Sequence, residues 1–375
     1  METEFVRWTE DGTEQSAVWR STSGATPPKK VRVADDSMTA DEAYRLACEG
    51  TALLWRGDFH NARQLGTAVA ARATRKPRKT STDPATAFHL HRQTQSRRAS
   101  ILGMLLVPFD ADQTIPLRRA PDVRQAVHEA YGPIDQPTVT TLRDLLGAIG
   151  AYEWQKKGVE IPALGARIHP GYGVFSPIRG EYVDLVADTP LPSLTKAFDI
   201  GTGTGVLAAV LAHRGVEKVV ATEIDAKALA CARANVDRLG YSDRVEVVQA
   251  DLFPEGRAPL VVCNPPWIPA RPTSPIEYAI YDPDSAMLRG FLRGLPEHLE
   301  PSGEGWLILS DIAEHLGLRT REELLALIGD AGLVVLERRD VAPRHGKIED
   351  RSDALYAARK REVTSLWRLA VRDRP

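Results

Sequence analysis

Short apolar runs alternate with helix-like segments in the part of the chain beyond residue 161. The runs are rich in β-branched residues and predict strands, whereas the segments between them show the three- and four-residue apolar spacing of helices. The predicted strands are 196–200, 218–222, 245–249, 260–263, 305–309, 333–339 and 366–371, and the predicted helices are 206–213, 226–239, 286–299, 320–331 and 353–360. Strands that alternate with helices predict an α/β fold with a mostly parallel sheet covered on both faces.

The first 150 residues show a different pattern. Helical spacing is found over 35–72, 122–131 and 141–157. The apolar run 101–109 fits either a buried helix end or a strand. We therefore predict a mainly helical domain over 31–150, with a role in substrate recognition, and a catalytic domain over 151–375. Residues 1–30 are polar and contain Pro27 and Pro28, and we expect them to form a flexible tail.

Composition narrows the class of protein. The chain has 375 residues, 43% of them hydrophobic and 26% charged, which excludes wholesale disorder and a disulfide-stapled miniprotein. Its formal charge of -2 provides no overall field for binding nucleic acid or a membrane. No apolar run approaches the length of a membrane helix, and the polar start does not resemble a signal peptide, so we expect a cytoplasmic protein without membrane association. The three cysteines, Cys48, Cys231 and Cys263, show no metal-ligand spacing, and we predict no metal site.

Basic residues gather in one stretch, 72–98. Its members are Arg72, Arg75, Lys76, Arg78, Lys79, Arg92, Arg97 and Arg98, with the single acidic residue Asp83. Such a cluster can neutralise the phosphates of an RNA or DNA substrate. A solvated loop and helix face has the same composition and is the more common case, and both interpretations remain open.

A glycine-rich turn lies between strand 196–200 and helix 206–213. Its residues are Gly201, Thr202, Gly203, Thr204 and Gly205. Residues without Cβ permit a tight turn and a close approach of backbone to ligand, and the free amides of the next helix can bind a polar group. The GxGxG spacing differs from the GxGxxG dinucleotide fingerprint. The turn indicates a site for a nucleoside-bearing ligand, although such turns also form for packing reasons.

Acidic residues follow the next two predicted strands. Glu223 lies about 20 residues beyond the glycines, where a carboxylate can accept hydrogen bonds from both ribose hydroxyls. Asp225 is expected to cap the helix that follows. Asp251 can accept a hydrogen bond from the exocyclic amine of an adenine, with Leu252 packed on the ring.

The fourth strand, 260–263, ends in Asn264, Pro265, Pro266 and Trp267. Two prolines prevent continuation of a strand ladder or a helix and stiffen the backbone. The side-chain oxygen of Asn264 and the carbonyl oxygen of Pro265 can then accept two hydrogen bonds from one planar amino group, on which Trp267 can stack. Such a cradle aims the nitrogen lone pair at an electrophile.

With these four strand ends, the chain resembles class I S-adenosylmethionine-dependent methyltransferases, in particular those with an Asn-Pro-Pro-aromatic motif. The resemblance covers roughly residues 165–375 and rests on DIGTGTG, Glu223, Asp251 and NPPW in this order. It implies a Rossmann-like, seven-stranded methyltransferase sheet with helices on both faces. It also implies S-adenosyl-L-methionine as cofactor, bound by Asp199, Gly201, Thr202, Gly203, Gly205, Glu223, Asp251 and Leu252, and an acceptor nitrogen held by Asn264, Pro265, Pro266 and Trp267.

Two branches of this family are similar in further segments. The stretch GVFSPIRGEYVDLV, with Pro177 and Glu181, resembles the segment before the first strand in methyltransferases that act on a glutamine of peptide release factors. The stretch PGYGVFS resembles the corresponding segment of ribosomal-RNA guanine-N2 methyltransferases. The tetrapeptide usually ends in Tyr in the first branch and in Phe in the second, whereas here it ends in Trp267.

The sequence thus predicts an S-adenosylmethionine-dependent N-methyltransferase that acts on a planar amide or aromatic amino nitrogen. Protein glutamine and an RNA base are the expected acceptor classes. Two alternatives remain open: methylation of a small metabolite, and a non-catalytic, methyltransferase-like module that binds a protein or RNA partner.

Two details of the acceptor side also remain open. Residues 282–290 either cover the acceptor or form an ordinary helix start capped by Asp284. His315 and His345 are candidate bases, but a methylated amine can lose its proton to water, so we assign no general base.

Overall fold

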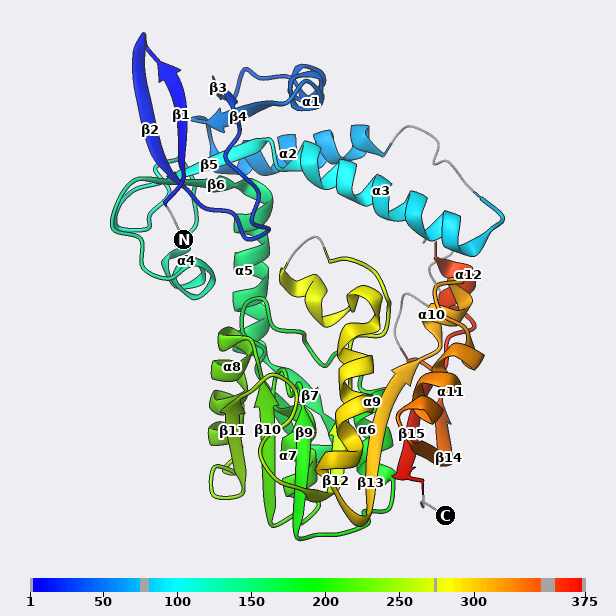
Figure 1. Cartoon of the computed structure of the whole chain (residues 1–375). Coiled ribbons are helices and arrows are strands. Elements are labelled where there is room, and N and C mark those ends of the chain that lie inside the picture. Colours follow the sequence, from blue (N-terminus) through cyan, green and yellow to red (C-terminus); the bar gives the residue numbers. More distant parts are fainter. Residues whose placement is uncertain (1–2, 75–80, 273–274, 345–354, 373–375) are drawn as a thin grey trace. The chain divides into compact units, whose positions relative to one another are not determined.

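The computed structural model describes residues 3–74, 81–272, 275–344 and 355–372. The chain forms two compact units. Unit 1 comprises residues 1–82 and 89–153, and unit 2 comprises residues 83–88 and 154–375. Figure 1 labels the helices and strands of both units.

Unit 1 contains a mixed sheet, which among its described residues has six strands in the order β1-β2-β6-β5-β4-β3. The strands are β1 (Phe5–Glu10), β2 (Thr13–Trp19), β3 (Lys30–Ala34), β4 (Thr51–Trp55), β5 (Leu105–Phe109) and β6 (Thr138–Thr141). The helices are α1 (Ala40–Cys48), α2 (Phe59–Ala73), α3 (Pro84–Leu102), α4 (Arg124–Tyr131) and α5 (Leu142–Lys157), of which α3 and α5 also reach into unit 2. The prediction of a mainly helical domain is corrected: the domain combines these helices with a six-stranded sheet.

The expected flexible tail is also wrong, because β1 and β2 form an antiparallel hairpin within it (Figure 1). Asp11 and Gly12 make the turn with φ of 50° and 76°. An Asp-Gly pair with positive φ at both positions suits the twist of a two-residue hairpin. The pair stands between two runs with strand character, and this was the sequence signal for the hairpin.

Two short apolar runs explain the remaining error in unit 1. The segments 51–55 and 105–109 are strands β4 and β5, which pair in parallel at Leu53 and Leu105. Every residue of β5 is buried, so the run shows no alternation. A short apolar run without a period fits a buried strand as well as a helix, and only the pairing with neighbouring strands decides between them.

Unit 2 contains the predicted sheet, with seven strands in its described residues in the order β11-β10-β9-β12-β13-β15-β14. They are β9 (Lys196–Ile200), β10 (Lys218–Glu223), β11 (Val245–Gln249), β12 (Ala258–Cys263), β13 (Leu299–Ser310), β14 (Leu333–Val341) and β15 (Thr364–Val371). The first five run parallel, and β15 lies antiparallel between β13 and β14. A small antiparallel pair, β7 (Val159–Ile161) and β8 (Ala166–Ile168), precedes this sheet. The mostly parallel, seven-stranded sheet is confirmed.

Helices cover both faces of this sheet. They are α6 (Glu181–Asp188), α7 (Val206–His213), α8 (Ala226–Arg238), α9 (Ala286–His298) and α11 (Arg321–Asp330). Two short helices, α10 (Ile312–His315) and α12 (Tyr356–Arg359), contact each other. Neighbouring residues of β9 point to opposite faces: Ala197 packs in the core with α6, α7 and α8, and Phe198 packs in the core with α9 and α11. The predicted helix 353–360 corresponds to α12, although 353 and 354 lie outside the described residues.

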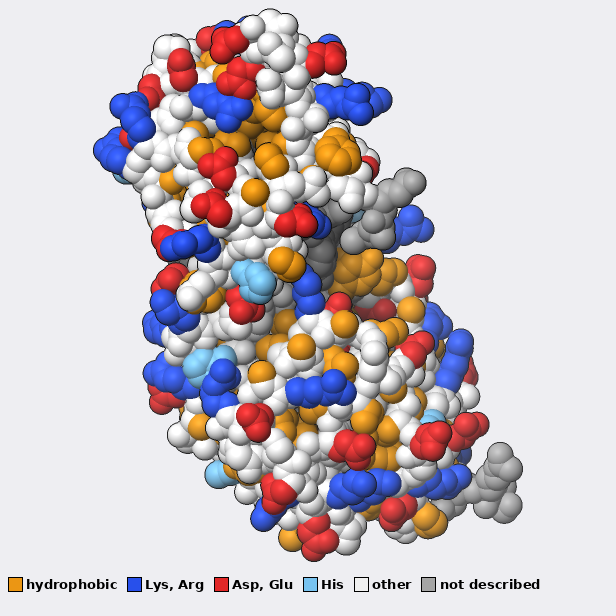
Figure 2. Space-filling model, turned by 90° about the vertical axis from the view of Figure 1, so that its left-hand side faces the viewer, with side chains coloured by type: hydrophobic (Ala, Val, Ile, Leu, Met, Phe, Trp, Pro, Cys, Tyr) orange, Lys and Arg blue, Asp and Glu red, His pale blue; other side chains and the backbone are white. Residues whose placement is uncertain are grey.

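The described helices include none with both the length and the apolar character needed to cross a membrane. On the face drawn in Figure 2, the basic and acidic side chains of the described residues are interspersed and form no patch of one sign.

Candidate active site

The four strand ends singled out in the sequence meet at one edge of the sheet in unit 2. Strands β11, β10, β9 and β12 are neighbours and run parallel, so their carboxyl ends lie together. Cys263, the last residue of β12, pairs with Ile200, the last residue of β9. Asn264 therefore follows β12 beside Gly201, which begins the glycine turn.

The glycine turn has the backbone geometry that requires glycine. Gly201, Gly203 and Gly205 have φ of 69°, 57° and 80°, a region that residues with a Cβ rarely adopt. A Cβ on Gly203 would meet no atom within 4 Å, so this side of the turn is open. The turn is tied to the sheet because Thr202 N donates to the carbonyl oxygen of Thr222 at 2.9 Å.

Asp199 lies beneath this turn and is 1% exposed. Its Oδ2 accepts hydrogen bonds from Thr202 Oγ1 at 2.6 Å and from Ala208 N at 3.0 Å. Burial raises the pKa of this carboxyl to about 6, against the effect of the two hydrogen bonds. The structure thus shows Asp199 supporting the turn and the start of α7, and its direct contact with the cofactor remains a prediction.

The carboxylate of Glu223 is oriented by backbone amides at the end of β10. Its Oε2 accepts from Gly203 N at 3.0 Å, and its Oε1 accepts from Ile224 N and Asp225 N at 2.9 and 3.0 Å. Because a carboxylate oxygen can accept two hydrogen bonds, Oε2 keeps a position for a hydroxyl donor. Asp225 caps α8 by accepting from Ala228 N, as predicted.

Beyond β11, Asp251 is exposed and Leu252 is half-buried. Leu252 has a φ of 66°, and its carbonyl oxygen accepts a hydrogen bond from Thr222 Oγ1. Its Cδ1 lies 2.6 Å from the point where a Cβ on Gly290 would stand, which places this side chain against helix α9. The roles of Asp251 and Leu252 toward the cofactor stay predictions.

The Asn-Pro-Pro-Trp segment is closed by a hydrogen bond of its own. Trp267 Nε1 donates to Asn264 Oδ1 at 2.8 Å, while Pro265 is buried and the other three residues are half-buried. The preceding residue, Cys263, is fully buried, and burial raises the pKa of its thiol well above the usual value. A neutral thiol is a poor nucleophile, so we assign no chemistry to Cys263, and the acceptor-binding role of Asn264, Pro265, Pro266 and Trp267 stays a prediction.

The segment after this loop corrects one prediction. Helix α9 is capped by Asp282, whose carboxylate accepts from Met287 N at 3.0 Å and Leu288 N at 3.1 Å. Asp284 is not the cap, because it takes a φ of 55° in the turn before the helix. Met287 reaches toward the glycine turn, since its Cε lies 2.5 Å from the point where a Cβ on Gly201 would stand.

The sequence did not point to several further residues around Trp267. Arg179 lies over the Trp267 ring and pairs with Glu181 and Glu362. Arg319 is buried, and its guanidinium faces the carbonyl oxygen of Trp267 at 3.5 Å. Arg179 lay inside the stretch GVFSPIRGEYVDLV, whereas Glu362 and Arg319 follow no motif in the sequence.

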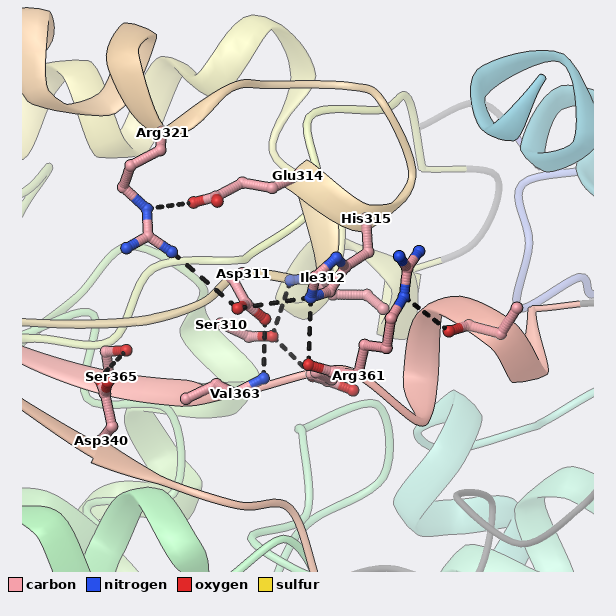
Figure 3. A network of polar contacts seen from close by, with 12 residues as sticks. Ser310, Asp311, Ile312, Glu314, His315, Arg321, Asp340, Arg361, Val363 and Ser365 are labelled. Atoms are coloured by element: carbon pink, nitrogen blue, oxygen red, sulfur yellow. Dashed lines mark hydrogen bonds and ion pairs between the residues drawn. The ribbon is translucent and has the colours of Figure 1, made fainter.

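Several predicted features lie elsewhere or outside the described residues. His315 belongs to a polar network around Asp311, where its Nε2 lies 3.1 Å from the carbonyl oxygen of Arg361 (Figure 3). His345 lies outside the described residues. So do four members of the basic stretch, Arg75, Lys76, Arg78 and Lys79, while Arg72 pairs with Asp41 at 2.6 Å. A phosphate-binding role for the stretch stays a prediction.

The donor and acceptor groups at this edge fit S-adenosylmethionine. Glu223 presents an oriented carboxylate suited to ribose hydroxyls, the glycine turn is open at Gly203, and Asn264 follows the neighbouring strand. A seven-stranded sheet that carries these elements at the ends of successive parallel strands defines a class I S-adenosylmethionine-dependent methyltransferase.

Comparison with known proteins gives the family. Residues 168–320 match the methyltransferase small domain. A tRNA1(Val) (adenine(37)-N6)-methyltransferase of Shewanella loihica is 28% identical over 213 residues, 52% of this chain and 85% of that protein. The protein of the same name from Bacteroides fragilis is 33% identical over 38% of this chain and 67% of that protein. A release factor glutamine methyltransferase of Cereibacter sphaeroides is 36% identical over 33% of this chain and 50% of that protein.

The chain belongs to the family of S-adenosylmethionine-dependent methyltransferases with the methyltransferase small domain. It is an enzyme, and the predicted cofactor and the predicted transfer of methyl to nitrogen are confirmed at the level of the family. The alternative of a non-catalytic module is set aside.

Proposed function

We propose that unit 2 transfers the methyl group of S-adenosylmethionine to the exocyclic amine of a base in RNA, with adenine N6 as the leading candidate. The observation that carries the proposal is the pairing of Cys263 with Ile200, which brings Asn264 beside the glycine turn. The RNA acceptor is supported by the relative from Shewanella loihica, named for adenine-N6 methylation, 85% of whose length this chain covers.

Asn264 and Pro265 would hold the amine. The Asn264 Oδ1 atom accepts one hydrogen bond from Trp267 Nε1 and can accept a second, and the Pro265 carbonyl oxygen can accept another. Two hydrogen bonds from one amino group turn its lone pair out of conjugation and fix its direction. The bound cofactor supplies a methyl group made electrophilic by the sulfonium. Formation of the nitrogen–carbon bond would break the carbon–sulfur bond, leave its electron pair on sulfur and let the amine release a proton to water.

A second candidate acceptor is the side-chain amide of a protein glutamine. It has the same planar NH₂ group, and the relative from Cereibacter sphaeroides is named for a glutamine of release factors. The hydrogen bonds offered by Asn264 and Pro265 suit both groups equally well, so these two acceptor atoms do not select between them.

The test is to incubate the full chain and cofactor labelled in its methyl group with separate RNA, protein and metabolite fractions of a cell extract. Label in RNA, recovered after digestion as a methylated base, supports the proposal. Label only in protein favours glutamine, and label only in metabolites refutes both macromolecular acceptors. Asn264→Ala serves as the matched control: we expect turnover to fall by a factor of about 100 or more, with the affinity for the cofactor unchanged by calorimetry.

A further inference from the structure

The Trp267 side chain is held on two sides. The guanidinium carbon Cζ of Arg179 stands 4.9 Å from the centre of the Trp267 ring, which is the geometry of a cation–π contact. On its edge, the indole Nε1 donates to Asn264 Oδ1 at 2.8 Å. The orientation of the ring and the orientation of the Asn264 amide are therefore linked.

Arg179 is itself fixed by two carboxylates. Its Nε lies 2.9 Å from Oε1 of Glu181, and its Nη2 lies 2.9 Å from Oε1 of Glu362. Both carboxylate side chains are 1% exposed, and Ser310 Oγ donates to the same oxygen of Glu362 at 2.7 Å. A guanidinium bonded through two of its nitrogens has a fixed plane, which the single ammonium of a lysine cannot reproduce.

The charges at this point exclude a role for Arg179 as an anion site. Its positive charge faces two buried carboxylates, Glu181 and Glu362, so the group carries no surplus positive charge for a phosphate. The guanidinium also lies over the Trp267 ring. The ion-paired Arg179 therefore holds the indole ring of Trp267 in place.

The hydrogen bond on the indole edge determines which end of the Asn264 amide is presented. An indole nitrogen can only donate, so it selects the oxygen of the amide and not the NH₂ group. Without this donor the amide can turn over and present its NH₂ group to the acceptor amine, where two donors would oppose each other. The fraction of molecules with a competent Asn264 then falls.

We propose that Arg179 is a positioning residue, which acts through Trp267 to keep the Asn264 oxygen turned toward the acceptor amine. The inference rests on the proposed function, in which Asn264 Oδ1 accepts from that amine. Under this proposal Arg179, Glu181 and Glu362 contribute to methyl transfer indirectly, through the position of Trp267.

The first test needs no acceptor. The indole N–H signals of the full chain, labelled with ¹⁵N, are recorded for the wild type, and Trp267→Phe identifies the Trp267 signal by its loss. Arg179→Lys should shift this signal and accelerate the exchange of its proton with solvent. Arg321→Lys is the matched control, because Arg321 stands 5.3 Å from the ring centre of another tryptophan, Trp367, and pairs with Glu314 (Figure 3). It should leave the Trp267 signal in place. An unchanged Trp267 signal in Arg179→Lys would overturn the proposal.

The second test is a double-mutant cycle on methyl transfer to the acceptor fraction identified above. Arg179→Lys and Trp267→Phe should each lower kcat by a factor of about 3 to 10, the value of one hydrogen bond. The KM for the cofactor should not change, and the double variant should be no slower than the slower single variant, because both changes act on the same atom. Multiplied effects on kcat, or an unchanged kcat in Arg179→Lys, would overturn the role of Arg179.

The two proposals fail in different ways. If Asn264→Ala retains full turnover, the proposed function fails, whatever the indole spectrum shows. If Asn264→Ala is inactive but Arg179→Lys has the kcat of the wild type, only the positioning role fails. Should Arg179→Lys not fold, Glu362→Gln keeps the shape of the side chain and weakens one hold on the guanidinium, and the same shift and loss of kcat are expected.

Discussion

Replacing Asp199 by asparagine should remove a pH-dependent part of the stability of unit 2. The carboxyl is 1% exposed, and burial raises its pKa from 3.8 to about 6. Asparagine keeps the shape and one oxygen acceptor for Thr202 Oγ1 and Ala208 N, but it does not titrate. The difference between wild type and variant therefore isolates this one proton.

The sign and size follow from the two pKa values. The folded chain holds the proton of Asp199 more tightly than the unfolded chain, so this stabilisation is complete below pH 3.8 and is lost as the pH rises through about 6. One pH unit corresponds to about 1.4 kcal/mol. Relative to Asp199→Asn, the free energy of unfolding of the wild type should fall by about 2.5 kcal/mol between pH 4 and pH 7.

The assay is urea unfolding of both proteins at half-unit steps from pH 4 to pH 7.5, followed by circular dichroism. A second variant, Thr202→Val, removes a hydrogen bond that lowers the pKa of Asp199, so this pKa should rise further. The fall in the free energy of unfolding with pH, measured against Asp199→Asn, should then be larger and extend to higher pH. A flat difference between wild type and Asp199→Asn would refute the reasoning. A difference that rises with pH would show that the hydrogen bonds outweigh burial.

Three further outcomes follow from the structure. Glu223→Ala should weaken cofactor binding, measured by calorimetry, by a factor of about 10 to 100 through the loss of charge-assisted hydrogen bonds, whereas Asp225→Ala, which removes only the cap of α8, should leave the affinity unchanged. Thr320→Ala breaks the capping box of α11 with Glu323 and should lower the free energy of unfolding by about 1 kcal/mol without altering turnover. Gly12→Ala places a Cβ at a φ of 76° and should destabilise unit 1 by about 1 kcal/mol in thermal unfolding. The cost comes from the backbone conformation alone, because the added Cβ would meet no atom within 4 Å. The reasoning on Glu223 is contradicted if Asp225→Ala loses as much affinity for the cofactor as Glu223→Ala. That on Thr320 is contradicted by a loss of turnover in Thr320→Ala, and that on Gly12 by an unchanged melting temperature in Gly12→Ala.

The sequence by itself determined the seven-stranded sheet of unit 2 and the set of residues along its edge. Strands 196–200 and 245–249 and helix 206–213 begin and end where predicted, because their apolar periodicity and the glycine and acidic residues that end them are local features. The carboxyl ends of parallel strands must share one edge, so the order of motifs was sufficient to bring Gly201, Glu223 and Asn264 together.

Only the tertiary structure decided the buried strands of unit 1 and the surroundings of the acceptor loop. The fully buried strand 105–109 carries no alternation, so its pairing partner and not its own pattern makes it a strand. Arg179 and Glu362 are 183 positions apart, and their ion pair depends on the arrangement of α6 and β15 around Trp267. Contacts between distant segments leave no local signal, because each partner alone is an ordinary polar residue until the fold buries them together.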